Sequence, residues 1–228
     1  MSKGKNKGEP QYDEVIRLMR EHGPERMGLM TSWAWHSDPK RLGFMLARYK
    51  FVAKMFDGSD HVLEIGCGDG FGSRIVAQGV KAVTAVDLDS DFIQSAQAVN
   101  CDRWPVTFKL HDVLESPVEG EFDGVYSLDV LEHIPEADER RFITNMIAPL
   151  SKHGVCIIGM PSLESQTYAS VYSKLGHVNC KSQLSLKTLM LSFFHNVFMF
   201  SMNDEVVHTG YHAMAHYNLC LCCGKITN

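Results

Sequence analysis

The sequence lacks an excess of basic charge, and it lacks a hydrophobic run long enough to cross a bilayer. It has 22 Lys and Arg against 27 Asp and Glu, so a strongly basic surface for nucleic acid is not expected. The most apolar late stretch, residues 189–202, is interrupted by Ser192, His195 and Asn196 and is too short for a membrane span. We therefore expect no nucleic-acid partner and no membrane association.

A secretory signal is not expected either, because the polar and basic residues 1–10 are not followed by an apolar region. The seven cysteines are an odd number, which without such a signal argues for reduced thiols. We expect residues 1–10 to form a flexible tail and the protein to be cytoplasmic.

Strand-like and helix-like patterns alternate through the middle of the chain. Apolar runs typical of buried strands, separated by helical patterns, lie at 61–65, 82–86, 106–110, 122–128 and 154–159. Two further strand patterns, at 197–202 and 213–222, close the chain. This alternation predicts an α/β fold with a doubly wound, mostly parallel, seven-stranded sheet and helices on both faces.

Two helices are predicted before the first strand. One spans 12–22, and the other spans 39–56 with Asp38 as its N-cap. We expect residues 11–56 to form a helical lid on a main domain of residues 57–228.

The segment that joins the first strand to the next helix is rich in glycine. Residues 62–72 read VLEIGCGDGFG, and glycines allow a sharp turn and a close approach of a ligand. A dinucleotide-binding fingerprint requires glycine at its sixth position, which is Phe71 when counted from Gly66. Counted from Gly68 that position is Ser73. A nicotinamide-dependent oxidoreductase is therefore the weaker alternative.

Acidic residues flank this glycine loop. Glu64 precedes the glycines inside the strand, where it suits a ligand that carries an ammonium group. About twenty residues later Asp87 ends the second strand, where a carboxylate can accept both hydroxyls of a ribose.

The string Glu-Ile-Gly-Cys-Gly-Asp-Gly resembles motif I of the class I, Rossmann-like methyltransferases that use S-adenosyl-L-methionine, and the resemblance extends over residues 60–161. It implies that Gly66, Gly68 and Asp69 line the methionine part of the cofactor, and that Asp87 binds the ribose. It further implies that Asp112 lies by the adenine amino group and that Leu88 and Val113 contact the two faces of the adenine ring. Asp112 is alternatively a helix cap, and Gly70 and Gly72 alternatively serve only the turn and helix packing.

Residues 127–135, SLDVLEHIP, are similar to motif IV of the small-molecule branch of this family, in which this strand end faces the methyl group. The resemblance places Asp129 beside the cofactor, whereas Glu132 is alternatively a solvated helix residue. Arg48, on the second predicted helix, is a candidate for holding the cofactor carboxylate through a bidentate pair, or alternatively a surface arginine.

Methyl transfer from a sulfonium needs orientation and exclusion of water, and it requires no metal. A hydroxyl acceptor also needs a general base, for which His133 and His208 are the candidates. The alternative for His133 is a structural histidine. His208, His212 and His216 recur every four residues, but Gly210 argues against the helix that a shared metal site would need. We therefore expect no metal.

The candidate acceptor-binding residues lie outside the two motifs described above. Trp33, Trp35 and His36 lie in a predicted polar loop of the lid, and His177 and Asn203 lie in late polar segments. Trp33 is alternatively a contact in a homodimer.

These features favour methylation of a small polar acceptor, on the oxygen of a sugar, a sugar nucleotide or a phosphorylated metabolite. A non-catalytic protein that binds S-adenosyl-L-methionine is the alternative, because it would keep Asp87 and Asp112 without needing a base.

Overall fold

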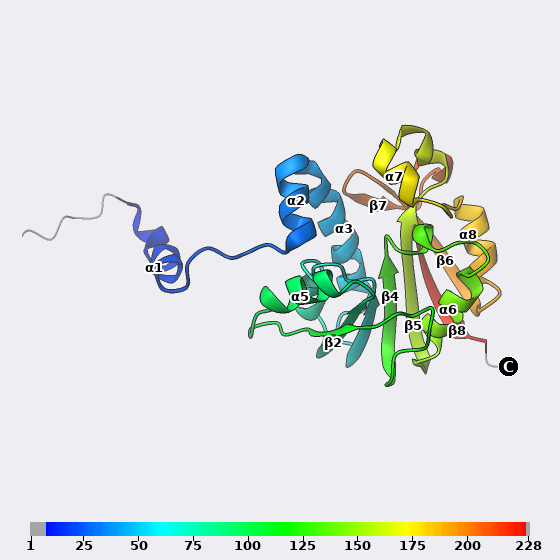
Figure 1. Cartoon of the computed structure of the whole chain (residues 1–228), viewed down its shortest axis with the longest axis horizontal. Helices are drawn as coiled ribbons and strands as arrows, with labels where there is room; N and C mark the ends of the chain where they lie inside the picture. The colour runs from blue at the N-terminus through cyan, green and yellow to red at the C-terminus, as the bar shows by residue number, and fades with distance from the viewer. Residues whose placement is uncertain (1–7, 227–228) are drawn as a thin grey trace, which may run out of the picture.

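The fold is built around one mixed sheet. The computed structural model describes residues 8–226, and within them eight strands lie in the order β3-β2-β1-β4-β5-β8-β6-β7 (Figure 1). The five strands that come first in the chain pair in parallel: β1 (His61–Ile65), β2 (Ala82–Asp87), β3 (Thr107–Leu110), β4 (Phe122–Leu128) and β5 (Leu150–Pro161). The other three pair antiparallel with their neighbours: β6 (Phe194–Asn203), β7 (Val206–His208) and β8 (Tyr217–Lys225).

This arrangement confirms the predicted α/β fold with a mostly parallel sheet, but the predicted count of seven strands was one too low. The additional strand is β7, which forms a hairpin with β6 through a turn in which Asp204 has a φ of 49°. A strand of three residues is too short for an alternating pattern to reveal it.

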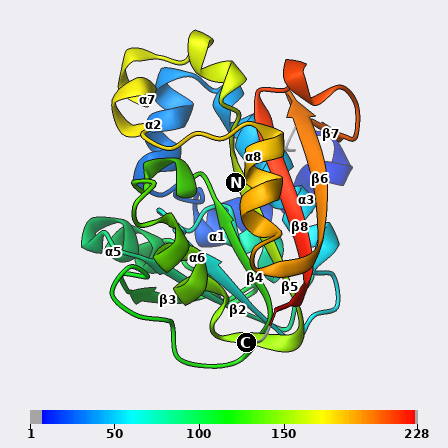
Figure 2. The same cartoon turned by 90° about the vertical axis from the view of Figure 1, so that its right-hand side faces the viewer.

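Helices cover both faces of the sheet. One face packs against α3 (Lys40–Met55), α4 (Ser73–Ala77) and α5 (Ser90–Ala98), and the other packs against α6 (Glu139–Ile147) and α8 (Gln183–Met190) (Figure 2). Adjacent strand residues alternate between the two layers, so that Val125 joins the α6 and α8 side while Tyr126 joins the α3 side. Because strands covered on both faces are apolar at every position, the parallel strands appear in the sequence as continuous hydrophobic runs.

The predicted lid, residues 11–56, is divided between the outside and the core. α1 (Asp13–His22) ends at Gly23, whose φ is +74°, buries none of its residues and stands away from the sheet (Figure 1). α3 instead supplies Tyr49, Val52 and Phe56 to the core. Of the predicted tail, residues 1–7 lie outside the described residues, and Pro10 begins a short 3-10 helix.

The prediction of a polar loop around Trp33, Trp35 and His36 was wrong, because these residues belong to α2 (Leu29–Ser37). The first turn of α2 is stabilised by the side chain of Asp69, which accepts a hydrogen bond from the Thr31 amide at 2.7 Å. A cap supplied from 38 residues away cannot be recognised in the local sequence.

The predicted N-cap of α3 was also wrong. The helix begins at Lys40 after Pro39, and no side chain caps it. The backbone carbonyl oxygen of Asp38, and not its side chain, accepts a hydrogen bond from the Arg41 amide at 3.1 Å. By contrast, α5 has a local side-chain cap, because the carboxylate of Asp89 accepts hydrogen bonds from the amides of Asp91 and Phe92.

Loops and short helices crowd the carboxyl edge of the parallel strands. They include α7 (Val171–Gly176) and the 3-10 helices Leu131–His133, Glu164–Tyr168 and His212–Met214. Among residues 8–226, no helix combines the length and the apolar character that a membrane span requires.

Candidate active site

The glycine loop lies at the carboxyl end of β1, where Gly66 and Gly68 both have positive φ angles, of 80° and 53°. Asp87, at the end of β2, holds this loop: one of its carboxylate oxygens accepts a hydrogen bond from the Gly68 amide at 2.8 Å, and the other accepts one from Asp89 at 3.0 Å. A Cβ atom at Gly68 would meet nothing within 4 Å. The loop therefore presents open space directly beside the Asp87 carboxylate, which is what a ribose-containing ligand needs.

The other two glycines serve packing, as their alternative interpretation stated. A Cβ at Gly72 would lie 2.2 Å from the ring of Tyr49, and a Cβ at Gly70 would lie 2.4 Å from the ring of Phe108. These glycines let α3 and β3 approach the loop closely.

Glu64 lies beneath the loop and is buried. It accepts hydrogen bonds from the Tyr49 hydroxyl at 2.7 Å and from the Ser73 hydroxyl. Burial raises the pKa of Glu64 to about 7, although these two hydrogen bonds act in the opposite direction. Glu64 thus joins β1, α3 and α4 under the place where a cofactor would lie.

Asp69 connects the glycine loop to α2. Its carboxylate accepts hydrogen bonds from the Thr31 amide at 2.7 Å and from the Thr31 hydroxyl at 3.1 Å, and the Leu29 amide donates to the Ser95 hydroxyl at 3.0 Å. The start of α2 is thereby fixed beside the loop and α5.

The predicted adenine-binding residues lie at the ends of β2 and β3. Leu88 is 67% exposed next to Asp87, so it offers a free apolar surface to a ring. Val113 is only 5% exposed and packs in the core on the α6 side. Asp112 accepts a hydrogen bond from the Leu114 amide at 2.8 Å within a turn, and because no helix begins there, the alternative of a helix cap was wrong.

Asp129, at the end of β4, has a φ of 58°, a conformation that is uncommon for residues other than glycine. Arg48 Nη1 lies 2.6 Å and 2.8 Å from the two Asp129 carboxylate oxygens. The Arg48 guanidinium also lies 3.8 Å from the centre of the Tyr217 ring. Arg48 is therefore a partly buried partner of Asp129 and not a surface arginine.

Glu132, His133 and His177 come together beyond Asp129, and their ligand atoms all lie within 4.8 Å of one another. Glu132 is 1% exposed, so the alternative of a solvated residue was wrong. Among the described residues neither of its carboxylate oxygens has a hydrogen-bond partner. Burial raises the pKa of the Glu132 carboxyl, and the negative charge of Asp129 acts in the same direction.

Both imidazoles of this group are oriented through Nδ1. His133 Nδ1 lies 2.8 Å from the Gly176 carbonyl oxygen, and His177 Nδ1 lies 2.8 Å from Oε1 of Gln166. An oxygen acceptor at Nδ1 fixes the proton there and leaves Nε2 with its lone pair. Burial lowers the pKa of His177, and the neighbouring His133 lowers it further.

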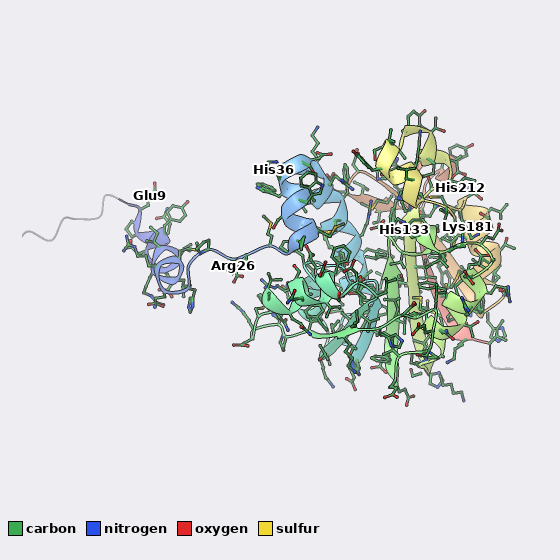
Figure 3. All side chains as sticks on the ribbon, in the orientation of Figure 1. Glu9, Arg26, His36, His133, Lys181 and His212 are labelled. Carbon is green, nitrogen blue, oxygen red and sulfur yellow. The ribbon has the colours of Figure 1, made fainter. Side chains whose placement is uncertain are left out.

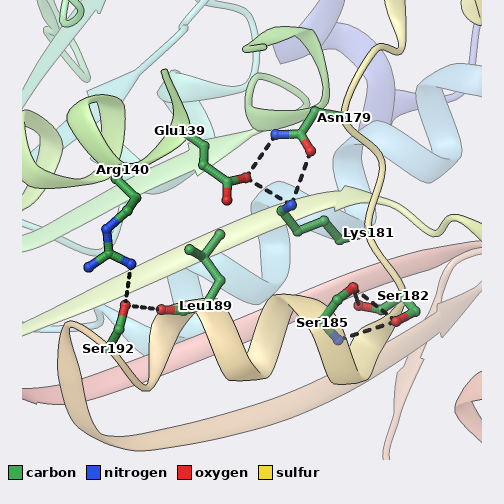
Figure 4. A network of polar contacts seen from close by, with 8 residues as sticks. All are labelled: Glu139, Arg140, Asn179, Lys181, Ser182, Ser185, Leu189 and Ser192. Carbon is green, nitrogen blue, oxygen red and sulfur yellow. Dashed lines mark hydrogen bonds and ion pairs between the residues drawn. The ribbon is translucent and has the colours of Figure 1, made fainter. Parts of the chain in front are cut away.

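The loop that carries His177 is held to the motif by backbone and side-chain contacts. The Glu132 carbonyl oxygen accepts hydrogen bonds from the amides of Val178 at 2.8 Å and Asn179 at 3.0 Å. Lys181 lies 2.8 Å from the carboxylate of Glu139 on α6, and Asn179 bridges the pair (Figure 4). These contacts explain how residues 45 positions apart form one group, which no sequence spacing indicated.

The structure separates the remaining predicted site residues from this group. His208 lies in β7, with Nε2 2.8 Å from Asn203 Oδ1 and with Nδ1 accepting a hydrogen bond from the Gly210 amide. Both of its nitrogens are thus engaged inside the hairpin. Trp33 and Trp35 are 63% and 56% exposed on α2, and His36 points outward from that helix (Figure 3).

Sequence reasoning did not select His216 and Tyr217, which lie where β8 begins, at the same edge of the sheet as Asp129. His216 Nε2 is buried and has no partner among the described residues. Burial lowers the pKa of His216, as does the positive charge of Arg48. The four-residue spacing of His208, His212 and His216 does not indicate this placement, because His216 and Tyr217 reach the site only through the antiparallel return of β8.

Comparison with known proteins finds a family match over the middle of the chain. Residues 62–154 match the family model of the methyltransferase domain. The chain is 26% identical over 144 residues to a ubiquinone biosynthesis O-methyltransferase of Psychrobacter arcticus, with 59% of this chain and 53% of the relative covered. It is 43% identical over 82 residues to the ribosomal RNA small subunit methyltransferase A of a Synechococcus species, with 34% and 28% covered. The chain thus spans about half the length, or less, of these curated relatives.

Among solved structures, the chain resembles the N-methyltransferase NodS from Bradyrhizobium japonicum in complex with S-adenosyl-L-homocysteine. The TM-score is 0.61 at 18% identity, with 95% of this chain and 99% of that chain covered. The strand order, the glycine loop with Asp87 and the family match agree with one another. The chain therefore contains a match to the methyltransferase domain at residues 62–154 and has the Rossmann-like fold of the class I S-adenosyl-L-methionine-dependent methyltransferases.

Proposed function

We propose that this protein transfers the methyl group of S-adenosyl-L-methionine to an oxygen of a small polar acceptor, such as a sugar, a sugar nucleotide or a phosphorylated metabolite. The proposal rests mainly on two groups of residues that lie at the same edge of the sheet. Asp87 and the open side of Gly68 form a cofactor cradle, and the group of Glu132, His133 and His177 lies beyond Asp129. The similarity to a ubiquinone biosynthesis O-methyltransferase supports oxygen as the methylated atom.

The cofactor, when bound, supplies an activated methyl group. The protein's own residues then have three tasks, which are to hold the cofactor, to orient the acceptor and to accept a proton. Asp87 would accept hydrogen bonds from the ribose hydroxyls, and Leu88 would cover one face of the adenine. α2, docked through Asp69, would limit the access of water to the cofactor.

His133 is the candidate for the proton acceptor, because its Nδ1 is bonded to the Gly176 carbonyl oxygen while its imidazole remains exposed. An imidazole whose Nε2 carries a lone pair can take a proton from a hydroxyl near neutral pH. His208 has no such free nitrogen in the structure, since both of its nitrogens bond within the hairpin.

The test is transfer of a labelled methyl group into a panel of small hydroxyl compounds, with carboxylate, amine and RNA acceptors included. We expect label in hydroxyl acceptors. We also expect His133→Asn to lower kcat by about 100-fold or more, as loss of a general base does. His208→Asn is the control and should keep most of the activity. Transfer only to amines or to RNA would refute the acceptor class, and cofactor binding without any transfer would favour the non-catalytic alternative.

A further inference from the structure

Glu132 raises a question that the fold alone does not answer. Its carboxylate is buried, and neither oxygen has a hydrogen-bond partner among residues 8–226. The nearby Arg48 lies against Asp129 instead. An ionised carboxylate without a partner is costly inside a protein, so such groups are normally paired with a cation or bound to a metal.

The neighbours of Glu132 are metal-ligating side chains. His133 and His177 offer ligand atoms that lie, with a carboxylate oxygen of Glu132, within 4.8 Å of one another. A divalent ion bound at about 2.0–2.2 Å from each ligand needs separations of roughly 3–4 Å, so small side-chain rotations would complete the site.

The surroundings of both histidines match those of metal ligands. Each Nδ1 is hydrogen-bonded to a fixed oxygen, that of the Gly176 carbonyl or of the Gln166 side chain. Metal-bound histidines usually donate their second ring N–H to such an oxygen, which fixes the ring and its tautomer. The rings of His133 and His177 meet at 63° with centroids 5.3 Å apart, so they are not stacked on each other.

The group of Glu132, His133 and His177 is buried on the side of the sheet and open toward solvent on the other side. Glu132 is buried, His177 is half-buried and His133 is exposed. The loop from His177 to Lys181 is fixed by the Glu132 carbonyl oxygen and by the buried pair of Lys181 and Glu139. Three protein ligands on one side would leave coordination positions free for an oxygen of another molecule.

We propose that Glu132, His133 and His177 bind one divalent transition-metal ion, of the type of Mn²⁺, Co²⁺ or Zn²⁺. Two imidazoles and one carboxylate suit these ions better than Mg²⁺ or Ca²⁺, which prefer oxygen ligands alone. The site lies on the acceptor side of Asp129 and replaces the expectation that the protein uses no metal.

A role for this ion in catalysis rests on the proposed methyl transfer. A hydroxyl of the acceptor that binds the ion would lose its proton to solvent more easily. Its oxygen would then form the bond to the methyl carbon as the carbon–sulfur bond of the sulfonium breaks and leaves a thioether. In that case His133 serves as a ligand, and the ion takes over the activation that a general base would otherwise provide.

The experiment uses the full chain, freed of metal with a chelator and titrated with Co²⁺, with visible absorption and calorimetry as readouts. We expect one equivalent to bind and to give the absorption bands of nitrogen and oxygen ligation, with no thiolate charge-transfer band. Glu132→Gln and His177→Asn should each weaken binding by more than 100-fold. Gln166→Ala, which removes only the partner of a ligand, should weaken it by about 10- to 100-fold.

His212→Asn and Cys180→Ser are the controls, because one removes a histidine outside the group and the other removes the thiol closest to it in sequence. Both should bind Co²⁺ as the parent chain does. Circular dichroism checks that each variant is folded, and His177→Asn carries the test if Glu132→Gln does not fold. Unchanged binding in both His177→Asn and Glu132→Gln, or a thiolate band lost in Cys180→Ser, would overturn the site. Methyl-transfer activity is not part of this readout, so the site and the proposed function can fail independently.

Discussion

The buried ion pair between Lys181 and Glu139 provides a quantitative test of how the His177 loop is held. The two side chains are only 10% and 11% exposed, and Lys181 also donates a hydrogen bond to Asn179 Oδ1 at 3.0 Å. Lys181→Met would leave the Glu139 carboxylate buried with Asn179 as its one side-chain donor in the network. We expect a loss of about 3–5 kcal/mol in the free energy of unfolding, because an uncompensated buried charge remains.

Urea unfolding measures this loss, provided that the slope with denaturant concentration stays constant. The control is Lys81→Met, which removes an ion pair with Asp60 in which both side chains are largely exposed, and which should leave stability unchanged. The double variant Lys181→Met with Glu139→Leu should be more stable than Lys181→Met alone. If Lys181→Met is no less stable than Lys81→Met, the pair does not hold the loop and the reasoning is refuted.

Two further predictions concern the glycine loop and the acid beneath it. Gly66→Ala should lower the midpoint of thermal unfolding more than Gly68→Ala does. Both residues have positive φ, but only at Gly66 would the new Cβ lie 2.2 Å from a Val130 methyl. Equal decreases in the two midpoints would contradict this. The pKa of Glu64 is about 7 in the folded state, raised from 4.5. Between these two values the folded state binds more protons than the unfolded state does. The stability that the protonated Glu64 contributes is therefore fully present below pH 4.5 and is lost as the pH rises to 7. The difference in unfolding free energy between the parent chain and Glu64→Gln should therefore shift by about 3 kcal/mol in favour of the variant across this range, and a difference that does not vary with pH would contradict it.

The sequence predicted those parts of the fold that depend on local patterns. The apolar runs from His61 to Gly159 predicted five parallel strands, because a strand buried on both faces is hydrophobic at every position. The cap of α5 is also local, since the carboxylate of Asp89 bonds to amides two and three residues away. The glycine loop and Asp87 were recognisable because their spacing reflects a single strand–turn–helix–strand unit.

The features that sequence reasoning missed depend on contacts between distant residues. The sequence predicts a loop at Trp33 and Trp35, whereas the structure has a helix there, because the cap of that helix is the distant side chain of Asp69. The sequence does not indicate the burial of Glu132, whose carbonyl oxygen is bonded to the distant loop of Val178 and Asn179. His216 reaches the site only because β8 pairs antiparallel with β5. Such contacts follow from packing and topology, which a pattern along the chain does not encode.

Calorimetry tests most directly whether the edge formed by the glycine loop and Asp87 binds S-adenosyl-L-methionine. The protein is titrated separately with S-adenosyl-L-methionine, S-adenosyl-L-homocysteine and NAD, and the titrations are repeated with Asp87→Asn and Asp123→Asn. Asp123 is the matched control, since its carboxylate also accepts two backbone N–H bonds, from Asp60 and His61, but at the opposite edge of the sheet. We predict binding of both adenosyl ligands and not of NAD, lost in Asp87→Asn and kept in Asp123→Asn. Binding of NAD alone, or equal adenosyl-ligand affinity in the parent chain and Asp87→Asn, would contradict the account.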